Sequence, residues 1–132
     1  MMTEGQNLKI LVIDDEAPIR HSLKEFLEDY DFAVVEADSA EAALLLIKNQ
    51  EFDVAIVDLR LPGISGDLFI LQANKFRQGL RYIIHTGSVG YRLSLELMDL
   101  GLKTNDVFRK PVENMYRFVE KINELLARSK GD

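Results

Sequence analysis

Residues 8–18 read LKILVIDDEAP, and this stretch decides the fold. Its first half is apolar almost without interruption, as expected of a strand that is buried on both faces of a sheet. Two acidic residues, Asp14 and Asp15, follow the apolar run directly, and Pro18 suits the first turn of a helix. The stretch therefore predicts a buried parallel strand that leads into a helix, with carboxylates where the strand ends.

The rest of the chain repeats this alternation of strand and helix. Short apolar runs rich in β-branched residues predict strands, and apolar residues at helical spacing predict the helices between them. Asp38 is expected to begin the second helix as a cap, and Gly101 to close the fourth. The expected strands are 8–14, 32–37, 53–58, 80–86 and 104–110, and the expected helices are 16–30, 38–49, 68–76, 88–101 and 112–128.

This alternation favours an α/β fold with a parallel sheet, right-handed crossovers and helices on both faces. Five strand–helix units are too few for an eight-stranded barrel, so an open, doubly wound sheet is expected. No linker or internal repeat interrupts the pattern. The sequence therefore indicates one domain over residues 1–132, with its core at about 8–128.

The composition excludes several classes of protein. The 132 residues include no cysteine, so disulfides, thiolate metal sites and cysteine nucleophiles are absent. No apolar run is long enough to span a bilayer, and the first residues lack the layout of a secretory signal, so we expect a cytoplasmic protein without membrane insertion. The net charge of −6 argues against nucleic acid as a direct partner, because phosphate backbones attract basic surfaces.

Polar residues follow the expected strands where each one ends. Asp14 and Asp15 follow the first strand, Asp58 the third, Thr86 the fourth and Lys110 the fifth. A single aspartate at a strand end is usually a cap or a turn residue, so the information lies in their joint occurrence. If the first and third strands are neighbours, three carboxylates meet, and each pair about 4 Å apart repels by roughly 4 kcal/mol at an effective dielectric constant of 20. Oxygen ligands without histidine or cysteine predict a hard dication, Mg²⁺ or Mn²⁺.

A dication, a lysine and a hydroxyl around a carboxylate are typical of phosphoryl transfer. The dication and Lys110 would neutralise phosphoryl oxygens, and Thr86 would donate a hydrogen bond to one of them. Asp58 is then the candidate nucleophile, which would form an acyl phosphate.

Four motifs, KILVIDDEAPIR, VDLRLPGISG, IIHTG and VFRKPV, resemble the receiver domain of bacterial two-component response regulators in order and spacing. The resemblance spans nearly the whole chain. It implies a flavodoxin-like sheet of strand order 2-1-3-4-5 and a signalling switch that catalyses its own phosphorylation and dephosphorylation, rather than an enzyme with a separate substrate. The phosphoryl group would come from a histidine of a sensor kinase or phosphotransfer protein.

The resemblance also implies a role for each residue of the site. Asp58 is the phospho-acceptor; Asp15 and Asp58 bind Mg²⁺ directly, Asp14 acts largely through water, and the backbone carbonyl of Arg60 is a further ligand. Thr86 and Lys110 contact the phosphoryl group, and the Lys110–Pro111 peptide bond is cis. Val107 stands where the family usually has a phenylalanine or tyrosine that moves with the threonine, so Tyr91 or Phe108 would have to take over that role.

The fourth helix suggests an interaction surface. One side of this helix carries an apolar stripe at helical spacing, formed by Leu93, Leu97 and Leu100. A second apolar stripe is either available to a partner or buried as well, if the helix makes a larger contact with the core. Together with strand five and helix five, it would bind a downstream effector protein or a second copy of the chain. This second stripe consists of Tyr91, Leu95 and Met98.

Other functions share this fold class. A flavodoxin-like electron carrier would need hydroxyl-rich residues after strand one, where DDEAP is acidic. A haloacid-dehalogenase-type phosphatase would need its nucleophile there, in an Asp-x-Asp arrangement. The remaining alternative is a pseudo-receiver, a docking module that does not depend on phosphorylation, and Val107 is its support. The chain could be a stand-alone receiver or a fragment of a larger regulator.

Overall fold

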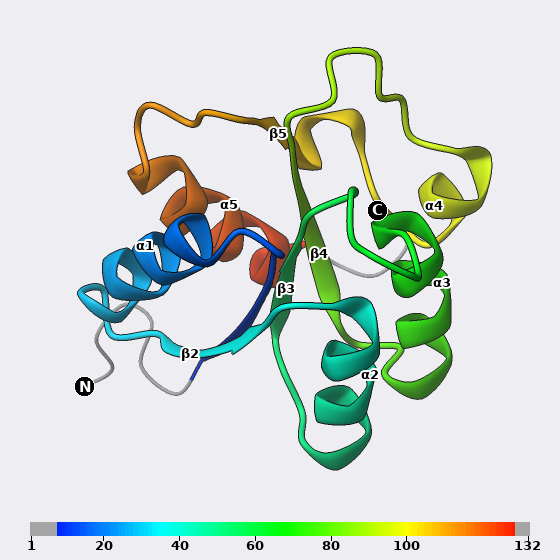
Figure 1. Ribbon diagram of the computed structural model, residues 1–132, viewed down its shortest axis with the longest axis horizontal. Coiled ribbons are helices and arrows are strands. Elements are labelled where there is room, and N and C mark those ends of the chain that lie inside the picture. Colours follow the sequence, from blue (N-terminus) through cyan, green and yellow to red (C-terminus); the bar gives the residue numbers. More distant parts are fainter. Residues whose placement is uncertain (1–7, 129–132) are drawn as a thin grey trace.

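The computed structural model describes residues 8–128 and contains one five-stranded parallel sheet (Figure 1). The strand order is β2-β1-β3-β4-β5, which confirms the expected topology. The expected domain bounds, 1–132, extend beyond the described residues at both ends. The strands are β1 (Lys9–Ile13), β2 (Ala33–Ala37), β3 (Val54–Val57), β4 (Arg81–Thr86) and β5 (Val107–Arg109).

Helices cover both faces of the sheet, so the molecule has three layers (Figure 1). α1 and α5 pack on one face, and α2, α3 and α4 pack on the other. Among the described residues, none of the helices has the length and apolar character that crossing a bilayer requires. The helices are α1 (Ala17–Glu28), α2 (Ala40–Asn49), α3 (Gly66–Phe76), α4 (Leu95–Asp99) and α5 (Tyr116–Ala127), with a 3₁₀ turn η1 (Thr104–Asp106) before β5.

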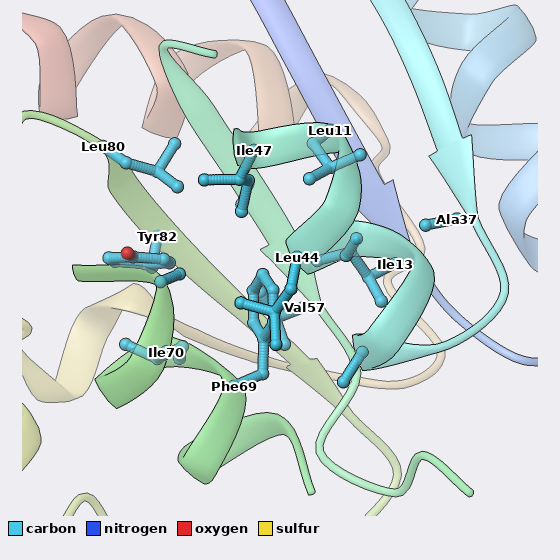
Figure 2. Close-up of a cluster of buried hydrophobic side chains, with 14 of the residues drawn as sticks. Leu11, Ile13, Ala37, Leu44, Ile47, Val57, Phe69, Ile70, Leu80 and Tyr82 are labelled. Atoms are coloured by element: carbon cyan, nitrogen blue, oxygen red, sulfur yellow. The ribbon is translucent and has the colours of Figure 1, made fainter. Parts of the chain in front are cut away.

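The apolar run of β1 supplies side chains to both cores, as its pattern predicts. Leu11 and Ile13 point to the α2–α3 side (Figure 2), and Ile10 and Val12 pack with α1 and α5. All four are at most 1% exposed. Burying an aliphatic side chain of this kind stabilises the folded state by about 1.5–3 kcal/mol, so β1 contributes to the stability of both hydrophobic cores.

The start of α2 differs from expectation. Ser39, not Asp38, is the cap: its hydroxyl accepts a hydrogen bond from the Ala42 N–H at 3.1 Å. Serine and aspartate are both good caps, and the side chain that reaches the free N–H groups of the first turn depends on where the backbone turns.

α4 is much shorter than the expected helix 88–101, because it begins only at Leu95. The Ser94 hydroxyl caps it by accepting from the Leu97 N–H at 3.1 Å. Its end is as expected: Gly101 has a φ of +106° and its N–H donates to the Met98 carbonyl at 2.9 Å. The preceding loop, residues 87–94, is attached to β5 instead, because the Arg109 guanidinium donates to the carbonyls of Ser88 and Tyr91 at 2.5 and 3.2 Å.

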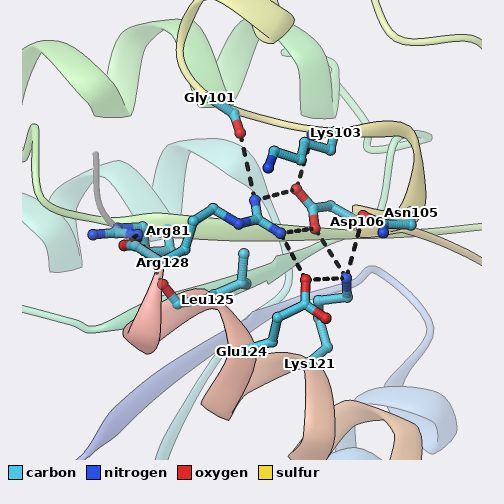
Figure 3. A network of polar contacts seen from close by, with 9 residues as sticks. All are labelled: Arg81, Gly101, Lys103, Asn105, Asp106, Lys121, Glu124, Leu125 and Arg128. Atoms are coloured by element: carbon cyan, nitrogen blue, oxygen red, sulfur yellow. Dashed lines mark hydrogen bonds and ion pairs between the residues drawn. The ribbon is translucent and has the colours of Figure 1, made fainter. Parts of the chain in front are cut away.

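The fifth strand is also shorter than the expected 104–110, because residues 104–106 form η1. Asp106 makes this turn by accepting from the Lys103 N–H at 2.9 Å, although its side chain is only 1% exposed. Arg128 contacts both carboxylate oxygens of Asp106 at 3.0 Å, and the Lys121 ammonium lies 3.2 Å away (Figure 3). We call Asp106, Lys121, Glu124 and Arg128 the Asp106 network; it connects η1 to the end of α5.

Candidate functional site

Two buried carboxylates lie side by side at the carboxyl edge of the sheet. Asp14 directly follows β1 and Asp58 directly follows β3, and these strands are paired. The Asp58 N–H continues the strand pairing by donating to the Ile13 carbonyl at 3.0 Å. Both residues are nearly inaccessible, with 2% and 4% exposure. The sheet topology therefore brings together acids that are 44 positions apart in the sequence.

Four acidic residues form a cluster at this edge: Asp14, Asp15, Glu16 and Asp58. One carboxylate oxygen of each lies within 4.8 Å of the others. Asp15 and Glu16 are exposed, so the cluster opens to solvent on their side. Sequence analysis missed Glu16, although it directly follows the aspartate pair.

Lys110 supplies positive charge to this cluster. Its Nζ lies 3.0 Å from Asp14, 3.2 Å from Glu16 and 3.4 Å from Asp58. Its backbone N–H donates to the Thr86 carbonyl at 2.8 Å, which fixes the residue at the end of β5. The peptide bond between Lys110 and Pro111 is cis.

The electrostatics of the site favour an added cation. Burial raises the pKa of Asp58, and the charge of Asp14 acts in the same direction, against the Arg60 N–H and Lys110. Burial lowers the pKa of Lys110, but its hydrogen bond to Asp14 and the charges of Asp14 and Asp58 outweigh this, so the net shift is upward. One lysine therefore faces four carboxylates, and their mutual repulsion is only partly offset.

The donor set fits a hard dication such as Mg²⁺ or Mn²⁺. All candidate ligands in the cluster are carboxylate oxygens, with no histidine among them. One oxygen of Asp58 accepts from the Arg60 N–H at 3.2 Å, and the other faces Lys110, so the carboxylate is oriented from two sides. The Arg60 side chain itself is exposed.

Thr86 ends β4 and is fully buried. Its hydroxyl oxygen accepts a hydrogen bond from the Ser88 N–H at 2.9 Å, so the side chain is engaged with the loop 87–94. Phe108 and Tyr91 are the two residues that could replace the aromatic residue absent at position 107. Phe108 packs against Phe118 on the α1–α5 face of the sheet, opposite to the face of Val107. Tyr91 lies in the loop, on the same face as Val107, and its hydroxyl donates to Asp67 at 3.0 Å.

The expected interaction stripe is divided by the shortening of α4. Leu95 and Met98 are on the helix and are 79% and 43% exposed. Tyr91 is not on the helix and is partly buried, so the stripe of three is wrong as a helical pattern. The other stripe packs toward the core, and it comprises Leu93, Leu97 and Leu100.

Comparison with known proteins identifies the family. The model of the response regulator receiver domain matches residues 10–123, and the chain belongs to this family. The chain is 32% identical to the two-component response regulator PhoP of Pseudomonas aeruginosa, over 94% of this chain and 54% of PhoP. It is also 32% identical to the transcriptional regulatory protein FixJ of Bradyrhizobium diazoefficiens, over 86% of this chain and 53% of FixJ. The chain thus spans about half the length of these relatives.

Solved structures agree with this assignment. A CheY-like receiver domain from Methanospirillum hungatei has a TM-score of 0.75 at 34% identity, covering 91% of this chain and 94% of that one. The response regulator TrrA of Thermotoga maritima, solved in complex with Mg²⁺–BeF, has a TM-score of 0.75 at 30% identity, covering 89% and 98%. The chain is therefore a receiver domain, a signalling switch of two-component systems.

Proposed function

We propose that the chain accepts a phosphoryl group on Asp58 from a histidine of a kinase or phosphotransfer protein, in a magnesium-dependent reaction. The observation that carries this is the convergence of Asp14, Asp58 and Lys110, whose Nζ lies 3.0 and 3.4 Å from the two carboxylates. Similarity to a regulator solved with Mg²⁺–BeF supports it. Asp14, Asp15, Asp58 and the carbonyl of Arg60 would hold the ion, which would add positive charge for the phosphoryl oxygens.

The reaction forms one bond and breaks another. A carboxylate oxygen of Asp58 attacks the phosphorus, while the P–N bond to the donor histidine breaks and its electron pair returns to the imidazole, which takes up a proton. Lys110 neutralises one phosphoryl oxygen. In hydrolysis a water oxygen attacks the phosphorus, and the products are inorganic phosphate and the free Asp58 carboxylate.

The switch would begin at Thr86. On phosphorylation its hydroxyl leaves the Ser88 N–H and donates to the phosphoryl group, and the loop 87–94 follows. Arg109 of β5 and Asp67 of α3 contact this loop, and α4 follows it directly in the chain, so the movement would reach β5 and α4. On α4, Leu95 and Met98 are exposed. Together with α5, these elements would form the surface that the switch changes. Tyr91, rather than Phe108, is then the aromatic residue that moves. To shift the ratio of active to inactive conformations from 1:99 to 99:1, phosphorylation must favour the active conformation by about 5.5 kcal/mol. A few charge-assisted hydrogen bonds would supply this free energy.

The test is phosphorylation of the purified chain by acetyl phosphate with Mg²⁺, followed by intact mass. We expect one phosphoryl group on the wild type, none on Asp58→Asn, and none when EDTA removes the metal. Asp38→Asn is the matched control, because Asp38 is an exposed aspartate at the end of β2, which is separated from the Asp58 strand β3 by β1. Uptake by Asp58→Asn at the wild-type rate, or none by the wild type, would contradict the proposal, and the latter would favour the pseudo-receiver.

A further inference from the structure

Arg20 of α1 connects three elements beside the acidic cluster. Its side chain is 13% exposed, and its guanidinium donates hydrogen bonds to two different acceptors. Nε donates to a carboxylate oxygen of Glu36, in β2, at 2.9 Å, and Nη1 donates to the backbone carbonyl of Asp14 at 2.7 Å. This carbonyl belongs to the planar peptide group that joins Asp14 to Asp15, so Arg20 fixes the orientation of the link between two candidate metal ligands.

The four polar atoms of Asp14 each have a partner. The N–H donates to the Ala37 carbonyl at 3.1 Å, and the two carboxylate oxygens accept from the Glu16 N–H at 2.9 Å and from the Lys110 ammonium at 3.0 Å. Arg20 is the partner of the remaining atom, the carbonyl oxygen. Removing its side chain would therefore take away one of four constraints on a residue that lies inside the cluster.

Glu36 keeps the guanidinium in this place. Its side chain is 20% exposed, and the oxygen that accepts from Arg20 also lies 2.6 Å from Nδ1 of His21. Arginine suits this position because the guanidinium presents its donors in a rigid, planar fork. With Nε anchored on Glu36, the terminal nitrogen is aimed at the Asp14 carbonyl, whereas a lysine ammonium is a compact charge on a flexible stem.

We propose that Arg20 is a positioning residue for the metal site, which orients the Asp14–Asp15 peptide so that both carboxylates meet one divalent cation. This role rests on the proposed function, because it concerns the same Mg²⁺. The sign of the effect separates positioning from charge. A cation beside the cluster repels Mg²⁺, so loss of the Arg20 charge alone should tighten binding. Loss of an outer contact that orients the ligands should instead weaken binding, by about 10- to 100-fold.

The test is a titration of the purified chain with MgCl₂, followed by the amide NMR shifts of residues 14–16 and 58–60. We expect Arg20→Met to raise the dissociation constant of Mg²⁺ by about tenfold. Arg20→Lys should raise it similarly although it keeps the charge, because an ammonium does not reproduce the fork. Glu36→Gln should bind Mg²⁺ nearly as the wild type does, because its amide oxygen can still accept from Nε of Arg20.

Lys24→Met is the matched control. Lys24 lies one turn further along α1 and also connects this helix to β2, since its ammonium donates to the Val34 carbonyl at 3.3 Å and to Glu28 at 2.7 Å rather than to Asp14. The variant should bind Mg²⁺ as the wild type does. Urea denaturation of both methionine variants measures their stability, and a contact that only attaches α1 to the sheet would change stability without changing the dissociation constant of Mg²⁺.

Three results would overturn the positioning role and leave the proposed function intact: saturable binding by the wild type that Arg20→Met leaves unchanged or tightens, full recovery by Arg20→Lys, or equal weakening by Lys24→Met. No saturable binding by the wild type would overturn both. A further measurement does not depend on the folding of a variant. In the wild type, the Nε–H proton of Arg20 should exchange with water more slowly than that of Arg92, which is exposed. Equal rates would mean that Glu36 does not hold the guanidinium.

Discussion

Gly66, the first residue of α3, lies directly against the backbone of Asp58. A Cβ at this position would lie 2.4 Å from the Asp58 carbonyl oxygen and 2.8 Å from the Cα of Leu59. Both are backbone atoms, so neither can move without displacing the residue that we propose to be phosphorylated. Gly66→Ala should therefore lower the free energy of unfolding by about 1–3 kcal/mol, the range for an overpacked interior, and slow phosphorylation by acetyl phosphate. Urea denaturation and intact mass measure the two effects.

Gly79→Ala is the matched control for this substitution. A Cβ at Gly79 meets nothing within 4 Å, and the residue is exposed in the turn before β4. Its midpoint in urea should be equal to or above that of the wild type, because alanine restricts the unfolded chain. Equal losses of stability in the two variants would mean that contact with Asp58 is not the cause.

Arg60 is exposed two positions after Asp58, where a long side chain can shield an acyl phosphate from water. We expect Arg60→Ala to shorten the lifetime of the phosphorylated chain several-fold. The measurement is the loss of radiolabel from purified phosphoprotein, with Arg92→Ala as the control at an exposed arginine of the loop 87–94. An unchanged half-life would show that Arg60 does not screen the phosphoryl group.

The positions of the charged residues of the site were predictable from the sequence, but not all of their contacts were. Asp14, Asp58 and Lys110 each follow a strand, and parallel strands end at one edge, so their convergence follows from topology. The third contact of Lys110, to Glu16, depends on how the chain turns into α1, which no spacing rule specifies.

At the scale of elements, the Asp106 network is what secures η1 to α5. Asp106 is 1% exposed, and it pairs with Arg128 and Lys121, which are also largely buried. Asp106→Asn should lower the free energy of unfolding at pH 7 by about 3 kcal/mol, the low end for removing one partner of a buried ion pair. Asp99→Asn, at an exposed aspartate of α4, is the control and should change stability little.

The effect of Asp106→Asn should depend on pH. Burial would raise the pKa of Asp106, but hydrogen bonds from Arg128, the Lys103 N–H and Lys121 outweigh it, and the pKa lies below its ordinary value of 3.8. A lowered pKa in the folded state means that the stabilisation is complete well above pH 3.8 and is lost as the pH falls through the folded pKa. Urea titrations should show wild type and variant converging at acid pH; a constant difference down to pH 2 would contradict this role.

The short α4 shows the limit of periodicity as a guide to elements. Apolar residues at helical spacing run through 88–101, yet only Leu95–Asp99 is helical. In place of helical hydrogen bonds, the loop 87–94 makes hydrogen bonds with Arg109 and Asp67, which are distant in sequence. β1 and β3 were predictable because a strand buried on both faces is apolar throughout, whatever its neighbours are.

For the molecule as a whole, magnesium should stabilise the fold. The acids of the cluster come together only in the folded sheet, so an ion that binds them favours the native state, by about 2.7 kcal/mol at a hundred times its dissociation constant. Thermal unfolding should shift upward with MgCl₂ in the wild type and much less in Asp15→Asn, which removes an exposed ligand without disturbing an ion pair. Asp38→Asn should respond as the wild type does. An equal response of all three chains would mean that the ion acts elsewhere.

The long reach of Lys110 has a consequence for the newborn protein. Its partner Asp14 is 96 positions earlier, so the ammonium joins the carboxylates only after β5 has been made and has paired with β4. At about 5–20 residues per second, a ribosome exposes the aspartates several seconds before that happens. During this interval the growing polypeptide would carry the proposed acceptor, Asp58, without the charge of Lys110, and a kinase would meet a competent target only after β5 has paired with β4.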